Sequence, residues 1–239
     1  MAILARANLA GANLEKANLI GVDLQGANLF MTNLTGVNLQ GANLEGAILE
    51  RDNLFMADLE RSNFKGAILD GANLEGANLR EADFKATYLI NVSLFGADLK
   101  RVNLEGTNLK GADLKETKLQ GANLREANLE GTTFIKANLY GTDLVESNLT
   151  GANFKEANLQ RTNLFMAKLE GTNFEGANLR GALNLSIDQL SKVRALYNVK
   201  LDEEFLIQIK EEFPFLFNSL EQQFIEYQSN LLGAIDNNL

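Results

Sequence analysis

The chain has 239 residues with 20 Gly, one Pro and neither His nor Cys, and its formal charge is −9. Without His or Cys it has no imidazole base, no Ser-His or Cys-His nucleophile, no Cys/His zinc site and no disulfide. The negative charge argues against non-specific binding to nucleic acid, and no apolar run approaches the roughly 18 residues of a membrane span. The sequence therefore predicts a cytoplasmic protein that is not an enzyme, with no cofactor, no metal, no nucleic acid partner and no membrane partner.

The sequence repeats with a period of five residues. Every fifth residue from Leu4 to Leu179 is Leu or Phe, which makes 36 consecutive positions with 31 Leu and five Phe. The position two residues earlier holds mostly small side chains, and the residue in between is mostly Asn or Asp, as in Asn8 and Asp23. Nineteen of the 20 Gly stand two residues after a Leu or Phe of the series. The pattern indicates one repeated structural unit.

A period of five fits neither an α-helix, with 3.6 residues per turn, nor a flat strand, with a period of two. It predicts a coil with one corner in each repeat. The large and the small residue then face inward, and the other three face water. Asn, Asp and Gly suit such corners because they tolerate tight-turn dihedrals or bond to the turn backbone.

Many of these segments resemble the A(D/N)LXX motif of pentapeptide repeat proteins, as at residues 12–16, 72–76 and 122–126. The resemblance covers about residues 2 to 182. It implies an all-β solenoid, a right-handed quadrilateral β-helix with four repeats per coil and about nine coils. We expect residues 1–182 to form this rod.

If one coil takes 20 residues, side chains 20 apart stack on one of four faces. We name each face after its first central residue: Leu4, Leu9, Leu14 and Leu19. The stacking predicts two ladders of phenylalanine rings in the core. These ladders consist of Phe64 on Phe84, and of Phe134, Phe154 and Phe174.

The register fails after Leu179, and the pattern becomes helical. Residues 183–239 are therefore expected to form a small C-terminal α-helical cap. Ser186 and Gln189 have capping-box spacing before a helix near 187–197, and Asp202 can cap a second helix through about Glu212. A third helix is expected from about Ser219.

Both ends of the rod are candidate sites of homodimerisation. The last apolar stripe of the tail is either a lid on the rod or a dimer surface, and it consists of Phe224, Ile225, Leu231 and Leu232. At the other end, Met1, Ile3 and Leu4 enter the first coil without a cap. Three interpretations stay open: that coil stacks end to end on another molecule, it frays, or a further segment precedes it.

The Leu9 face interrupts the outward Asn/Asp column on three successive coils. We define a candidate contact strip on this face that comprises Phe30, Met31, Ile48, Ile68, Tyr88 and Ile90. The neighbouring Leu14 face adds Phe55, Met56 and Phe95. Two interpretations stay open: the side chains pair across coils and stabilise the face, or they form a protein-contact site.

Asp52 is the one acid at an inward small position, with Thr32 and Ala72 stacked on either side. A buried carboxyl requires hydrogen bonds or a shifted pKa. We expect the Thr32 hydroxyl or a turn N–H to satisfy it, or the coil to bulge locally. No catalytic role is assigned because no second activated group accompanies it.

Some pentapeptide repeat proteins bind DNA gyrase, a property attributed to a rod with the charge of DNA. Here residues 1–182 carry a net charge of only −4, with Lys and Arg interleaved, and residues 183–239 carry −5. A DNA-like potential is therefore weak. The sequence favours a non-enzymatic rigid scaffold or protein interaction module with an unidentified protein partner, and a DNA mimic that binds gyrase or topoisomerase is the alternative.

Overall fold

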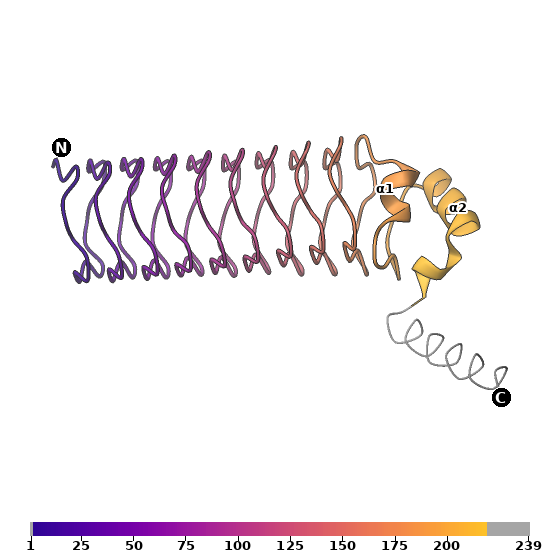
Figure 1. The fold of residues 1–239 in the computed structure, drawn as a ribbon, viewed down its shortest axis with the longest axis horizontal. Coiled ribbons are helices and arrows are strands. Elements are labelled where there is room, and N and C mark those ends of the chain that lie inside the picture. Colours follow the sequence, from indigo (N-terminus) through magenta and orange to yellow (C-terminus); the bar gives the residue numbers. More distant parts are fainter. Residues whose placement is uncertain (1, 219–239) are drawn as a thin grey trace, which may run out of the picture.

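The computed structural model describes residues 2–218, which form a rod of stacked coils with a short helical segment at one end (Figure 1). Within this range the coils contain no extended strand. Isolated parallel bridges instead join residues 20 apart, in an unbroken series from Ile3 with Asp23 to Asn163 with Leu183. The predicted stacking of residues 20 apart is confirmed.

Each repeat turns at the two residues that follow its Leu or Phe. The Ala7 N–H donates to the Leu4 carbonyl at 3.0 Å, and the same bond recurs along the rod. The second turn residue has a positive φ in every repeat, from +61° to +69° where it is Gly and from +54° to +59° where it is not. Glycine adopts this conformation without strain, which explains why 19 of the 20 Gly occupy this position.

The corner conformation predicts opposite effects at two stacked positions. Gly106 has φ +64° and an added Cβ would meet no atom within 4 Å, so Gly106→Ala adds only backbone strain. Ala86, at φ +55° on the same corner, already carries that strain. We expect Gly106→Ala to lower the free energy of unfolding by about 1 kcal/mol and Ala86→Gly to raise it by a similar amount. Urea titration measures both, and changes of the same sign would contradict this account.

The rod axis is filled by the large and small residues of the repeat. The Leu and Phe side chains at every fifth position from Leu24 to Leu179 are buried. The ring centroids of Phe64 and Phe84 lie 4.5 Å apart. In the second ladder the spacings are 4.6 Å between Phe134 and Phe154, and 5.4 Å between Phe154 and Phe174. Both predicted ladders are confirmed.

Up to residue 218, three helical elements follow the repeats: α1 (Ile187–Ser191), α2 (Glu203–Glu212) and a 3₁₀-helix, η1 (Pro214–Phe217). The predicted capping box is present, because the side chains of Ser186 and Gln189 bond each other's backbone N–H.

The predicted helix over 187–197 is too long, since α1 ends at Ser191. The residues after it continue the coil instead, and Ala195 and Lys200 bridge Asn173 and Asn178 at a spacing of 22 residues. The exposed hydrogen-bonding edge of the preceding coil thus holds this segment in an extended form.

The sequence predicts that Asp202 caps a second helix. Its position at the start of the helix is correct, but the predicted cap bond is not formed. Asp202 stands at the N-cap of α2 but makes no side-chain cap bond there. Its carboxylate accepts the Gly181 N–H at 3.0 and 3.2 Å and so ties the helix to the last repeat. The third helix and the four residues of the proposed cap or dimer surface, Phe224, Ile225, Leu231 and Leu232, lie outside the described residues. The boundary at residue 182 stays a prediction.

Candidate protein-contact surface

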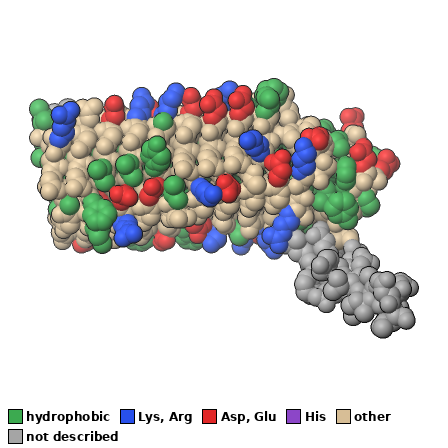
Figure 2. Space-filling view, in the orientation of Figure 1, with side chains coloured by type: hydrophobic (Ala, Val, Ile, Leu, Met, Phe, Trp, Pro, Cys, Tyr) green, Lys and Arg blue, Asp and Glu red, His purple; other side chains and the backbone are tan. Residues whose placement is uncertain are grey.

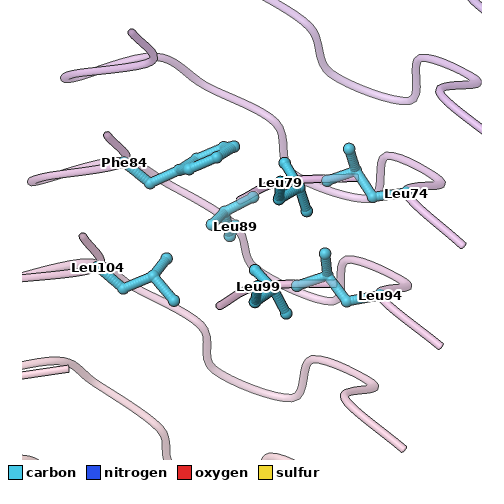
Figure 3. A pocket seen from close by; sticks show the side chains of 7 residues that line it. All are labelled: Leu74, Leu79, Phe84, Leu89, Leu94, Leu99 and Leu104. Atoms are coloured by element: carbon cyan, nitrogen blue, oxygen red, sulfur yellow. The ribbon is translucent and has the colours of Figure 1, made fainter. Parts of the chain in front are cut away.

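The hollow on the rod axis within residues 74–104 is not a binding cavity. The side chains of seven core residues converge on the rod axis (Figure 3) and leave no room for a water molecule. Within residues 2–218, no group of carboxylates could hold a metal ion. In the same part of the chain, no helix is long and apolar enough to cross a bilayer. The outer faces of the rod are therefore the candidate functional surface.

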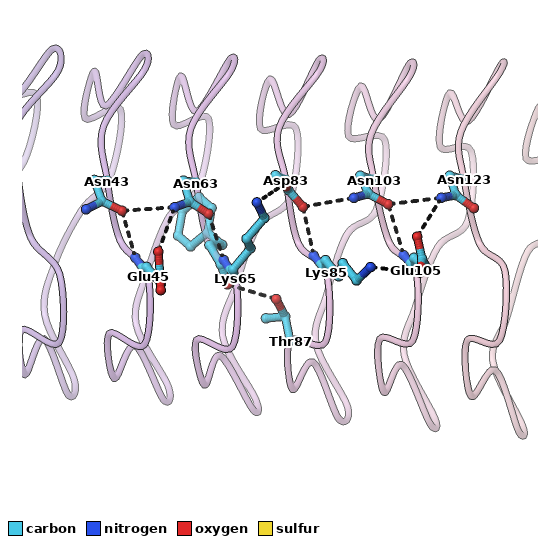
Figure 4. Close-up of polar contacts among 11 residues, drawn as sticks. Asn43, Glu45, Asn63, Lys65, Asp83, Lys85, Thr87, Asn103, Glu105 and Asn123 are labelled. Atoms are coloured by element: carbon cyan, nitrogen blue, oxygen red, sulfur yellow. Dashed lines mark hydrogen bonds and ion pairs between the residues drawn. The ribbon is translucent and has the colours of Figure 1, made fainter.

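An asparagine ladder covers most of the outer faces. Figure 4 shows it on the Leu4 face, where Asn63 Nδ2 donates to Asn43 Oδ1 at 3.0 Å and Asn103 Nδ2 donates to Asp83 Oδ1 at 3.0 Å. The same acceptor closes its own corner, because Asn43 Oδ1 accepts the Glu45 N–H at 3.3 Å. Each rung therefore ties one coil to the next and also fixes a turn.

The candidate contact strip breaks this ladder. Asn28 still accepts the Phe30 N–H at 3.1 Å, but Ile48, Ile68 and Tyr88 replace the next three rungs. Ile48, Ile68 and Tyr88 have no amide or carboxylate oxygen that could accept the N–H two residues later, as Asn28 does. At the third interruption, Asp70 Oδ1 substitutes by accepting the Ile90 N–H at 2.7 Å. The strip thus lacks the corner bond that Asn and Asp make in this column, and it differs from the interruptions at Ser93, Lys118, Thr133 and Lys168 in being apolar over three successive coils.

The side chains of the strip reach solvent to different extents. Met31 is 57% exposed, Tyr88 50% and Phe30 37%, and the three isoleucines are half-buried. On the Leu14 face, Phe55, Met56 and Phe95 are also exposed. Figure 2 shows hydrophobic side chains gathered on the N-terminal half of the visible face, beside charged ones. Parallel bridges join Ile48 to Ile68 and Ile68 to Tyr88, so the structure stacks these three residues on one face.

Two methionines of this surface, Met31 and Met56, stand at corners of the coil and are exposed. Met31 and Met56 have φ values of +58° and +56°, which disfavour residues other than Gly and Asn. The Met56 side chain lies over the corner of the next coil, and a Cβ on Gly76 would lie only 2.7 Å from its sulfur. Arg, Lys and Glu occupy many other corners at the same φ, so this strain is common to them, and the two methionines differ in exposing an apolar side chain there.

A third Phe–Met corner escaped the sequence analysis. Phe165 and Met166 are 48% and 65% exposed, and they line a hollow of about 390 Å³ with Asp188, Gln189 and Lys192 of the α1 region. The tetrapeptide Asn-Leu-Phe-Met recurs at 28–31, 53–56 and 163–166 and is the signal that could have revealed it.

Charged side chains on the outer faces pair between adjacent coils. Arg80 lies 2.7 Å from Asp98, and Arg61 lies 2.9 Å from Glu81. The hydrogen bond from Arg61 lowers the pKa of Glu81 from its usual value. Such pairs cancel the field of each carboxylate within a few ångströms.

Asp52 is buried, as its position in the repeat indicates. Its Oδ1 accepts the Thr32 N–H at 2.7 Å, so the expected turn N–H bond is confirmed. The Thr32 hydroxyl donates to the Leu9 and Leu29 carbonyls instead. Asp52 Oδ2 has no partner, and burial raises the pKa of Asp52 to about 8.

The family model for pentapeptide repeats matches residues 2–51 and 57–186. Among solved structures, the chain is similar to HetL, a pentapeptide repeat protein involved in heterocyst differentiation regulation from the cyanobacterium Nostoc sp. strain PCC 7120. The two are 28% identical over 83% of this chain and 86% of HetL, with a TM-score of 0.68. A trypsin-treated variant of QnrB1, a plasmid-mediated fluoroquinolone resistance protein, is 21% identical over 82% of this chain and 95% of QnrB1, with a TM-score of 0.52. That likeness is one of fold alone. The comparison with curated proteins gave no match.

Proposed function

The chain belongs to the pentapeptide repeat family, and we propose that it is a non-enzymatic rigid scaffold that binds a protein partner through the candidate contact strip. The rod would comprise nine coils of repeats, closed at the C-terminus by the helical segment. A filled axis and a regular hydrogen-bonded wall give a stiff support whose function lies on its outer faces.

The interrupted asparagine ladder carries this proposal. Ile48, Ile68 and Tyr88 replace rungs that elsewhere bond both the next coil and the local corner. Tyr88 and Met31 keep half or more of their surface in water. Exposed apolar side chains that replace stabilising polar contacts are typical of a recognition surface.

The alternative, a DNA mimic that binds gyrase, has weaker support. Lys and Arg side chains pair with many of the outer carboxylates, as in Arg61 with Glu81 and Lys85 with Glu105, and this pairing weakens a DNA-like field. A gyrase supercoiling assay separates the two functions. Inhibition or quinolone protection at micromolar protein would favour the mimic, and no effect would favour the scaffold.

The double variant Ile68→Asn, Tyr88→Asn tests the strip. Asparagine at these positions would rebuild the ladder, so we expect the melting temperature to be unchanged or higher. Capture of the partner in a pull-down should fall at least tenfold, because the centre of the apolar surface is lost. Circular dichroism and quantitative mass spectrometry measure the two quantities.

Tyr140→Asn is the matched control, because Tyr140 is an exposed aromatic residue on another face, 5.8 Å from the Arg161 guanidinium. It should leave capture unchanged. If the double variant unfolds, the strip is structural, and if it folds and captures the same proteins as before, the strip is not the binding site.

A further inference from the structure

The last coil of repeats has one open side, on the Leu9 face. In the coil before it, the Leu149 N–H donates to the Lys168 carbonyl at 2.9 Å, and the same bond recurs in every earlier coil. A second N–H donates in the same way from the corner that precedes this face. In the last coil these two groups belong to Leu169 and Met166, and within residues 2–218 neither has a hydrogen-bond partner.

The open side arises within the chain, at the point where α1 forms. The chain covers the other three sides of this coil, with the carbonyls of Leu183, Ala195 and Lys200 as acceptors. Between Leu183 and Ala195 it leaves the regular coils and forms α1 (Figure 1). Helix formation therefore removes the acceptors that a further repeat would supply on the Leu9 face.

Gln189 of α1 satisfies the acceptors of this side but not its donors. Its Nε2 donates to the Leu164 and Ala167 carbonyls, each at 2.9 Å. Its Oε1 accepts the Ser186 N–H at 3.0 Å and is therefore engaged elsewhere. Leu169 is only 2% exposed. An unpaired N–H in such a position is costly, and a carbonyl supplied by a ligand would remove that cost.

We propose that this side binds a short extended peptide of a protein partner, which pairs in parallel with residues 166–169. Two peptide carbonyls three residues apart would accept the Met166 and Leu169 N–H groups, as carbonyls of the next coil do elsewhere. The hollow of about 390 Å³ beside α1 adjoins both residues and gives room for the segment. Addition of a peptide to an open edge is a common mode of recognition. The site is separate from the candidate contact strip and does not depend on it.

The side chains around the hollow define the peptide, because equivalent residues of successive coils stack. Phe165 and Met166 are exposed and call for an apolar residue followed by Gly, since the corner at Met166 has a φ of +55°. Ala167 is buried and favours a small residue next. Lys168 and Glu170 are exposed, so an acidic and then a basic residue, two positions apart, complete the match.

Residues 94–100 of the chain, Leu-Phe-Gly-Ala-Asp-Leu-Lys, have this order and supply a probe. Within the rod the Phe95 carbonyl accepts the Gly76 N–H at 2.9 Å, and the Asp98 carbonyl accepts the Leu79 N–H at 2.8 Å. These are the two bonds that the open side lacks. Asp98 also forms a parallel bridge with Lys118, which places an acid over a lysine as the proposal requires.

Titration of the full chain with this peptide, blocked at both ends, tests the site by amide NMR. We expect the signals of Met166 and Leu169 to shift with a dissociation constant of about 1 mM or lower. Hydrogen exchange of the Leu169 N–H should slow roughly tenfold at saturation, because it gains a bond. The exchange of Leu129, in an inner coil, should not change. The peptide of reversed sequence should produce neither effect.

Phe165→Ser with Met166→Gly should weaken peptide binding roughly tenfold, because the apolar contact is lost. Phe55→Ser with Met56→Gly is the matched control, since it removes the same dipeptide where the corner N–H is already bonded, to the Glu75 carbonyl at 2.9 Å. It should leave binding unchanged.

Three results would overturn the proposal. The first is no shift at about 5 mM peptide, and the second is equal weakening by both double variants. The third is a Leu169 N–H that, in the free chain, exchanges as slowly as that of Leu149. That result would mean that another segment of the chain or a second copy already occupies the open side.

Discussion

Replacing Asp52 with threonine is expected to raise the free energy of unfolding by about 2–4 kcal/mol at pH 7. Asp52 occupies an inward position that other repeats fill with Ala, Thr, Val or Ser. Its Oδ2 has no hydrogen-bond partner. A threonine there could donate to the backbone as its equivalents do. The Thr87 hydroxyl donates to the Phe64 carbonyl at 2.8 Å, and the Thr107 hydroxyl donates to the Phe84 carbonyl at 2.7 Å.

The same substitution should remove a pH dependence. Burial raises the pKa of Asp52 from 3.8 to about 8, and the Thr32 N–H offsets this only in part. Between these values the native state holds the proton and the unfolded chain does not. The stability is therefore greatest below about pH 4 and falls as the pH rises to about 8, by at most about 1.4 kcal/mol per unit. Above pH 8 this contribution no longer changes.

Urea titrations at pH 4, 6 and 8 on both proteins isolate the effect, because their difference cancels the other carboxylates. Asp58→Asn is a suitable control, since Asp58 belongs to the outer ladder, where it accepts the Asn78 side-chain amide at 3.0 Å. It should leave the slope between pH 4 and 8 unchanged. A parallel pH dependence in the original chain and in Asp52→Thr would show that Asp52 is not the cause.

The regular part of the fold was predictable because each coil makes the same contacts. Once the period is five and a coil takes 20 residues, the class of a residue determines its burial, and Phe64 must lie on Phe84. The candidate contact strip was also predictable, because Ile48, Ile68 and Tyr88 depart from the column of Asn and Asp on the Leu9 face.

The C-terminal segment was less predictable because two tendencies compete there. Ile187, Leu190, Val193 and Leu196 have helical spacing, yet only the first two lie within α1. The open edge of the last repeat captures the rest, as the Phe174 N–H donates to the Ala195 carbonyl at 3.0 Å. The Asp202 carboxylate is likewise used by Gly181. The outcome depends on which backbone N–H and C=O groups of the preceding coil are still unpaired. The local sequence pattern of residues 183–218 does not show this.

Phe154→Ala is expected to cost the most stability of any single change in the core. Phe154 lies between two rings, with centroids 4.6 Å from Phe134 and 5.4 Å from Phe174. Truncation to alanine removes a fully buried ring, at a cost of about 3–5 kcal/mol, and breaks both stacking contacts. Urea unfolding measures the loss. Phe64→Ala should cost less, because Phe64 has a single stacking contact, with Phe84.

Phe154→Leu separates the ring from the volume that it fills. Leucine occupies 31 of the 36 central positions, so the coil accepts it without changing its backbone, and we expect a loss of about 1 kcal/mol. In a solenoid each coil contacts only its neighbours, so the alanine variant should also lose hydrogen-exchange protection first around residues 134–174. Equal stability of the Ala and Leu variants would mean that the rod relaxes around the cavity. In that case the rings contribute little to the stiffness that a scaffold requires.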